Sequence, residues 1–212
     1  MTLLSLPGRN DRPAPVSRAD WVAAGLDVLL EKGVAAVQIT LLARRLKVTR
    51  GGFYWHFEGR EALLDALLAE WRARNTGVML DAVEAADSLE AGVLSLFSVW
   101  VDHTRFDPAL DQAVRDWGRR APSVETLVRA EDDARVVAIA VFFRRMGYPA
   151  TEAFIRARVI YFTQLSYYST GVEEPMAARL GYLEAYFESF TGRSISDEAA
   201  AAFRANLGQA AP

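Results

Sequence analysis

Residues 40–63 constrain the fold of this chain most, because they are patterned as two short helices joined by a tight turn. Apolar residues recur at helical spacing over 41–46. Thr40 is a suitable N-cap for that helix, since its hydroxyl can accept a hydrogen bond from an unpaired backbone N–H. A two-residue turn follows, after which Thr49 is placed to cap a second helix. Two helices in this arrangement form a helix-turn-helix, in which the second helix enters the major groove of DNA.

The second helix has one apolar side and one side with hydrogen-bond donors and a glycine. Phe53 and Phe57 are four residues apart and therefore share the side that is expected to be buried. Arg50, Gly51 and Tyr54 are expected to point outward. A glycine inside a helix costs about 1 kcal/mol relative to alanine, so Gly51 is best explained by close approach of the backbone to a partner.

The chain resembles the DNA-binding domain of the TetR family of transcriptional regulators across residues 17–67. The likeness is most specific in Val-Thr-Arg-Gly-Gly-Phe-Tyr-Trp-His-Phe at 48–57, followed by Arg60 and Leu63. Lys47 stands where the family usually has Gly or Ala. The resemblance implies base-edge or groove contacts from Thr49, Arg50 and Gly51. It implies phosphate contacts from Thr40, Tyr54, His56 and Arg60.

Composition narrows the remaining classes of protein. The chain has no cysteine, so it has neither disulfides nor a thiolate metal site, and two histidines alone cannot build a zinc site. We expect no metal and no cofactor. The longest apolar run, 136–143, is too short to span a bilayer, and residues 1–8 lack the features of a signal peptide. The sequence therefore predicts a cytoplasmic protein.

Charge is divided unevenly along the chain. The net charge is −3, but residues 1–75 hold 11 Lys or Arg against 8 Asp or Glu, a net of +3, which leaves −6 for the rest. The basic part is the part with the helix-turn-helix. A chain with a basic part and an acidic part would attract phosphate at the first and repel it at the second. The alternative is that surface charges are unevenly distributed by chance.

The rest of the chain indicates an all-α protein, with no strand alternation or hairpin turn to compete. Ser17 and Asp20 form the capping box of the first helix, which Gly33 ends. The expected organisation is an N-terminal three-helix helix-turn-helix domain followed by a larger helical domain for ligand binding and dimerisation. Its parts are a flexible arm at 1–16, either a DNA-contacting basic arm or a solvated tail, the DNA-binding domain at 17–60, a connecting helix at 61–74, and the larger domain at 75–212. Helices in the larger domain are expected at 87–100, 107–117, 123–146, 151–170, 175–190 and 197–207.

The larger domain is rich in aromatic residues. At helical spacing, such residues most often form ordinary core. Several Tyr and Trp together with a few polar groups are nevertheless typical of a small-molecule pocket, and the family resemblance implies one here. The expected pocket lining is Trp100, His103, Trp117 and Phe142.

The helices expected at 151–170 and 175–190 carry more apolar surface than one packed layer needs. We expect two copies to pack them into a four-helix bundle, with a thick-cored monomer as the alternative. A single recognition helix per chain also favours a homodimer, because a palindromic site supplies one half-site per subunit. The expected interface residues are Tyr161, Leu165, Leu183 and Phe187.

The sequence thus predicts a repressor that a small molecule releases from a palindromic DNA operator. Its expected partners are double-stranded DNA, an effector and a second copy of the chain. A regulator without a ligand, or one that activates, is an alternative. Another is a helical enzyme that uses His103 beside a nearby aspartate as general acid or base. No Gly-rich phosphate loop, nucleophile elbow or His-Glu-x-x-His pattern supports an enzyme, which is therefore not expected.

Overall fold

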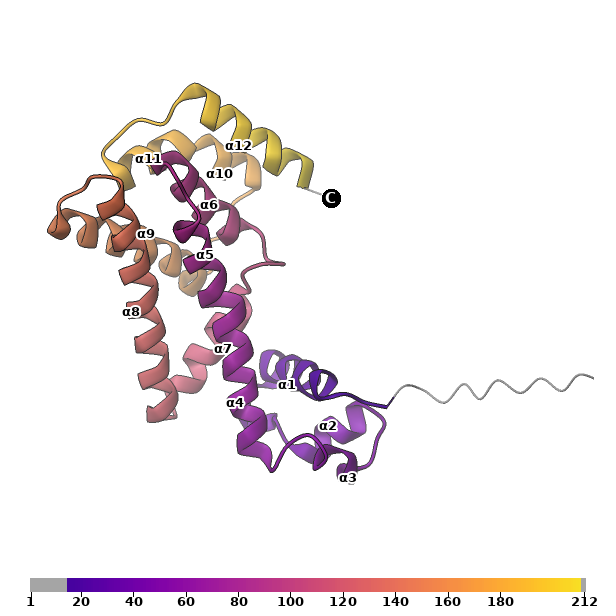
Figure 1. Ribbon diagram of the computed structural model, residues 1–212. Coiled ribbons are helices and arrows are strands. Elements are labelled where there is room, and N and C mark those ends of the chain that lie inside the picture. Colours follow the sequence, from indigo (N-terminus) through magenta and orange to yellow (C-terminus); the bar gives the residue numbers. More distant parts are fainter. Residues whose placement is uncertain (1–14, 211–212) are drawn as a thin grey trace, which may run out of the picture. The chain divides into compact units, whose positions relative to one another are not determined.

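The computed structural model describes residues 15–210, and side-chain exposure over 15–207. Within this part of the chain every regular element is a helix, as predicted (Figure 1). Two compact units are present, Met1–Ala66 and Leu67–Pro212. Most of the predicted arm, residues 1–14, lies outside the described residues.

The first unit is built around the predicted helix-turn-helix. The capping box at its start is confirmed, since the Ser17 hydroxyl accepts from the Asp20 backbone N–H and the Asp20 carboxylate accepts from the Ser17 N–H. Gly33, with φ of 76°, ends the first helix as expected. The helical elements are α1 (Arg18–Lys32), the 3₁₀ turn η1 (Val34–Ala36), α2 (Ile39–Arg45), α3 (Arg50–Phe53) and the beginning of α4 (Arg60–Trp71).

Capping inside the motif differs from the prediction. Helix α2 begins at Ile39 with Gln38 in the N-cap position, so Thr40 lies inside the first turn and is not the cap. Thr49 does occupy the N-cap position of α3, which begins at Arg50 as predicted, but the Thr49 side chain makes no capping bond. The hydroxyl of Thr49 is therefore not used by the helix that it precedes.

The core of the first unit is aromatic. Phe53 and Phe57 are buried as predicted, with ring centroids 5.3 Å apart. Trp21 of α1 meets the Phe53 ring edge-on at 5.2 Å. These contacts hold α3 against α1 and leave the opposite side of α3 exposed.

The second unit takes up the end of α4 and the rest of the chain. Its elements are the π-helical stretch η2 (Arg72–Gly77), α5 (Val78–Glu84), α6 (Leu89–Val101), α7 (Pro108–Gly118), α8 (Pro122–Arg145), α9 (Ala150–Thr170), α10 (Met176–Gly181), α11 (Leu183–Thr191) and α12 (Asp197–Ala210). The helix expected at 175–190 is in fact two, which meet at Tyr182. Helix α12 continues to Ala210, beyond the end expected at 207.

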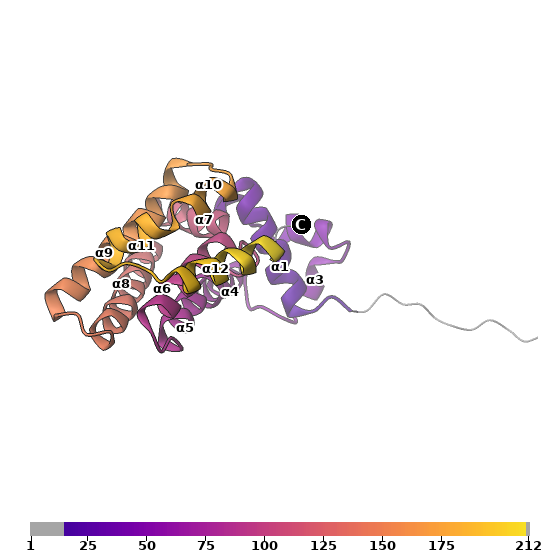
Figure 2. The same ribbon diagram turned by 90° about the horizontal axis from the view of Figure 1, so that it is seen from above.

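Helices α8 and α9 lie side by side in both views (Figure 2). Ala153 and Ala157 on α9 are buried, and such small side chains allow close approach of two helices. On the other side of α8, the Phe142 ring occupies the space that a Cβ at Gly92 of α6 would need. The core of this unit is thus formed where α8 packs between its neighbours. In the described part of the chain, no helix is long and apolar enough to cross a membrane.

Candidate nucleic-acid interface and internal cavity

The exposed side of α3 and the turn after it carry a polar and aromatic surface. Arg50 and Gly51 are exposed, as predicted. Tyr54 is 61% exposed and Trp55 is 89% exposed, although both carry large rings. Exposed aromatic side chains with polar groups, next to an arginine, suit contact with sugars and phosphates.

Three cations flank this surface without an ion-pair partner among residues 15–210: Arg44, Lys47 and Arg50. Arg45 differs, because its guanidinium pairs with Glu31 at 2.8 Å and Asp27 at 3.2 Å. The hydrogen bond that Arg45 donates to Glu31 is the main cause that raises the pKa of Arg45. Arg45 therefore joins α2 to α1, and the other three cations remain for an anionic partner.

Arg60 was expected to contact phosphate, but most of its guanidinium is hydrogen-bonded to backbone carbonyls of the same unit. Its Nε donates to the Val37 carbonyl at 2.7 Å and its Nη2 to the Val34 carbonyl at 2.8 Å. Its Nη1 pairs with Glu61 at 3.1 Å. Arg60 thus fixes the segment around η1, and only Nη1 can turn to a phosphate, by leaving the exposed Glu61.

His56, the other basic residue expected at a phosphate, is half-buried. Its Nε2 lies 3.0 Å from the backbone carbonyl of Val16, immediately before α1. This contact ties the entry of α1 to the end of the motif. Thr40 and Tyr54, the remaining expected phosphate ligands, are both exposed.

A cavity of about 70 Å³ lies inside the second unit. We call it the chamber. Six large side chains of its apolar wall are Phe97, Trp100, Leu183, Tyr186, Phe190 and Phe203. Its polar lining is Thr163, Gln164, Glu174 and Arg179. A concave apolar space with a few polar groups is the usual form of a small-molecule site.

A second, open hollow adjoins the chamber, and we call it the outer hollow. His103, Tyr168 and Glu173 line the outer hollow but not the chamber. Four side chains line both spaces: Gln164, Tyr167, Glu174 and Arg179. The chamber and the outer hollow therefore meet at these four residues.

The four residues expected to line the pocket lie in different places. Trp100 lines the chamber, and His103 lies in the outer hollow. Phe142 is core, packed on α6, and Trp117 is buried on α7; neither lines the chamber or the outer hollow. Helices α7 and α8 contribute no residue to either space. Aromatic spacing cannot tell a ring that faces a cavity from one that fills the core.

Residues from the C-terminal helices were missed. Arg179 and Phe203 line the chamber, although α10 and α12 follow α6 by more than seventy positions in the sequence. No local pattern in the sequence of α10 or α12 predicts that these helices reach the chamber.

The expected dimer residues are mostly inside the protomer. Tyr161 and Leu183 are each 3% exposed, Phe187 is 0% exposed, and the partly buried Leu165 packs against the same core. These side chains are not available to a second copy. A different set on the same two long helices is exposed: Val137, Val141, Ile155, Val159 and Phe162.

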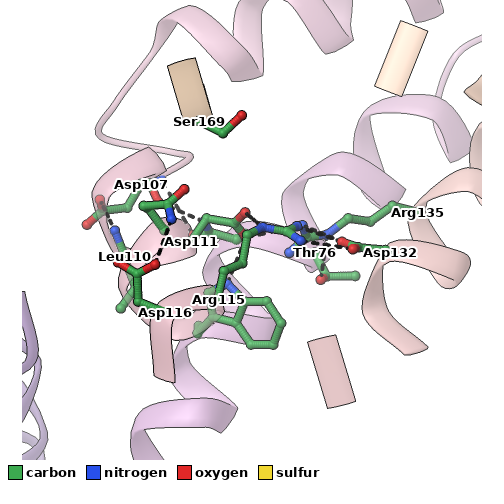
Figure 3. Close-up of polar contacts among 12 residues, drawn as sticks. Thr76, Asp107, Leu110, Asp111, Arg115, Asp116, Asp132, Arg135 and Ser169 are labelled. Atoms are coloured by element: carbon green, nitrogen blue, oxygen red, sulfur yellow. Dashed lines mark hydrogen bonds and ion pairs between the residues drawn. The ribbon is translucent and has the colours of Figure 1, made fainter. Parts of the chain in front are cut away.

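A cluster of charges is buried in the second unit, between α7, α8 and α9 (Figure 3). Arg135 donates to Asp111 at 3.2 Å, and Arg115 donates to Asp111 at 2.7 Å and to Asp132 at 2.6 Å. The Tyr161 hydroxyl donates to Asp132 at 2.6 Å and accepts from Arg135 at 3.0 Å. The cluster explains why Tyr161 faces inward.

The two arginines determine the charge state of Asp111. Burial by itself raises the pKa of Asp111, but Arg135 and Arg115 outweigh burial and hold that pKa below its ordinary value of 3.8. Trp71 also donates to the Asp111 carboxylate, at 2.9 Å. The cluster is therefore a set of compensated buried charges.

Comparison with known proteins identifies the first unit. Residues 22–67 match the family described as "Bacterial regulatory proteins, tetR family". A stretch of 46 residues, 22% of each chain, is 50% identical to tetracycline repressor protein class G of Vibrio anguillarum. A stretch of 56 residues, 26% of each chain, is 39% identical to the HTH-type transcriptional regulator SrpR of Pseudomonas putida. The chain therefore spans only about a quarter of the length of these curated relatives.

The whole fold resembles a solved regulator. The ketosteroid transcriptional regulator KstR2 of Mycobacterium tuberculosis superposes with a TM-score of 0.61 at 17% identity, over 88% of this chain and 100% of that one. The proteins that this chain resembles are transcriptional regulators and not enzymes. The chain carries a tetR-family DNA-binding domain.

Proposed function

We propose that this chain, whose first unit is a tetR-family DNA-binding domain, is a dimeric repressor that a small molecule releases from a palindromic operator. The exposed surface of α3 and its turn carries the proposal, because it combines Arg50, Thr49 and Gly51 with two exposed aromatic rings. Arg50 reads a base edge, while Thr40, Tyr54 and Trp55 meet the sugar-phosphate backbone. Since operator DNA lies in the bacterial cytoplasm, the protein acts there.

The second copy packs on the exposed apolar side of α8 and α9. Ile155, Val159 and Phe162 follow one another at helical spacing on α9. Val137 and Val141 form a similar row on α8. Two copies of this pair of helices form a four-helix bundle with twofold symmetry, which matches the symmetry of a palindromic site.

The chamber in the second unit is the effector site. A ligand that binds there lowers DNA affinity only if it binds more tightly to a dimer whose recognition helices do not match successive half-sites. A hundredfold reduction needs about 2.7 kcal/mol of coupling, which is typical of allostery. By reciprocity, the operator must weaken the ligand by the same factor.

Retardation of DNA that contains the promoter of the protein's own gene tests this function. We expect a discrete complex that resists excess random DNA and that is lost when an effector is added. A protein that retards promoter and random fragments equally would not be an operator-binding repressor.

A further inference from the structure

The four side chains shared by the chamber and the outer hollow form a polar neck between them. Gln164 and Tyr167 come from α9, Glu174 from the loop before α10, and Arg179 from α10. The chamber behind this neck is lined mainly by aromatic and aliphatic side chains. A molecule that fills the chamber therefore places its apolar body inside and its polar end at the neck.

Two atoms of the polar neck lack a hydrogen-bond partner. Gln164 Nε2 and Glu174 Oε2 are buried, and neither has a partner of good hydrogen-bond geometry among the described residues, although Gln164 lies near the Tyr168 hydroxyl and Glu174 near the Tyr167 hydroxyl. The Tyr167 hydroxyl bonds the Tyr186 hydroxyl, and the Arg179 guanidinium lies over the Tyr167 ring, 5.7 Å from its centroid. The neck therefore needs one acceptor for Gln164 and one donor for Glu174.

Charge limits which groups can supply them. The carboxylate of Glu174 and the guanidinium of Arg179 carry opposite formal charges, so the neck is close to neutral overall. An anionic head group would meet the negative charge of Glu174, and a cationic one would meet the positive charge of Arg179. A neutral group that both donates and accepts avoids both costs.

We infer that the chamber binds a neutral molecule with an apolar, ring-containing body and a carboxamide-like head. Its N–H donates to Glu174 Oε2 and its carbonyl accepts from Gln164 Nε2. The inference deepens the proposed effector site and rests on that proposal. It concerns ligand chemistry, however, so it can be tested without DNA.

Four molecules of nearly equal shape separate the possibilities: benzamide, acetophenone, benzoate and benzamidine. Acetophenone keeps the carbonyl of benzamide but has no N–H, while benzoate and benzamidine carry a negative and a positive charge. In calorimetric titration of the full chain, we expect benzamide to bind about tenfold more tightly than each of the others. Equal binding of benzamide and acetophenone, tighter binding of either ion, or no saturable binding of benzamide would overturn the inference.

Variants of the neck give three different signatures. Glu174→Met should reduce the preference for benzamide over acetophenone to about one, because only the N–H contact is lost. Gln164→Met should weaken both by about tenfold, since both carbonyls lose their donor. Glu174→Gln leaves Arg179 unbalanced and should move the preference toward benzoate.

Glu173→Gln is the matched control, because Glu173 lines the outer hollow but not the chamber. It should leave all four affinities unchanged, and a circular dichroism melt shows that each variant is folded. A change of preference in Glu173→Gln equal to that in Glu174→Gln would overturn the assignment. If benzamide binds as expected but leaves the DNA complex intact, the ligand chemistry stands and the proposed release mechanism fails.

Discussion

Lys47, in the turn between α2 and α3, has a φ of 57°. This left-handed conformation brings a Cβ close to the following carbonyl and costs roughly 1 kcal/mol for a residue other than glycine. The position joins the two helices that form the motif. The chain thus keeps a cation beside its recognition surface at the expense of backbone strain.

Replacing Lys47 by glycine should remove that strain. We expect Lys47→Gly to raise the free energy of unfolding by about 0.5 to 1 kcal/mol, measured by urea denaturation. Lys47→Ala removes the same charge but keeps the Cβ, so it should bring no gain. Equal stabilisation by both variants would show that charge, and not backbone conformation, is responsible.

Arg50 should supply sequence discrimination. At the start of α3 it is exposed and has no ion-pair partner within residues 15–210. Arg50→Ala should cost about 1 to 3 kcal/mol on the preferred site and reduce the preference over random DNA, measured by competitive retardation. Arg44→Ala removes an exposed cation that we expect to meet only phosphate, so it should instead weaken both DNAs alike. If the two variants behave identically, Arg50 does not read a base.

At the scale of elements, local signals predicted most helix boundaries. Helix caps and helix-ending glycines depend on only a few neighbouring residues, so they can be recognised in the sequence alone. Examples are the N-caps Ser17 and Asp107 and the positive-φ glycines Gly33, Gly171 and Gly192. The break at Tyr182 and the π-helical stretch η2 carry no such local signal.

The side of a helix that faces a partner is harder to predict than the helix itself. Helix α9 is apolar on two sides, and the large Tyr161 was assigned to the interface because size and apolarity alone were visible. Its hydroxyl instead bonds Asp132 on α8, and the small side chains of Ala153 and Ala157 on the same helix as Tyr161 are buried as well. Ile155 and Val159 remain exposed in a row on this helix, where we propose that the second copy packs.

A charged residue on that row should therefore separate the dimer. Val159 is 46% exposed, so Val159→Glu should fold normally but elute as a monomer in size-exclusion chromatography and lose tight DNA binding. Leu30→Glu, at a similarly exposed apolar residue of α1, should remain dimeric.

Phe187→Ala tests whether Phe187 belongs to the core of the protomer and not to the dimer interface. Because Phe187 is buried, the Phe187→Ala variant should be about 3 to 5 kcal/mol less stable than the parent protein and should remain a dimer.

At the scale of the whole molecule, the buried charge cluster makes stability depend on acidity. The carboxylate of Asp111 has a pKa below 3.8 in the folded protein, so the stability that it contributes is present above that value and is lost as the pH falls through the folded pKa. Acid should therefore loosen the second unit where α7, α8 and α9 meet.

Asp111→Asn should cost about 3 to 5 kcal/mol at neutral pH, because Arg135 and Arg115 lose a buried partner. The difference from the parent protein should shrink as the pH falls below 3.8, measured by urea unfolding at several pH values. Asp133→Asn changes an exposed carboxylate on α8 and should show neither effect. A constant difference between Asp111→Asn and the parent at every pH would contradict the titration of Asp111.

The exposure of Trp55 makes the protein its own optical reporter. The chain has five tryptophans, and the other four, Trp21, Trp71, Trp100 and Trp117, are buried. A dissolved collisional quencher such as iodide therefore reaches chiefly the indole of Trp55. When DNA covers the surface around α3, that emission should become shielded from iodide, so occupancy of the operator can be followed in unlabelled protein by fluorescence alone.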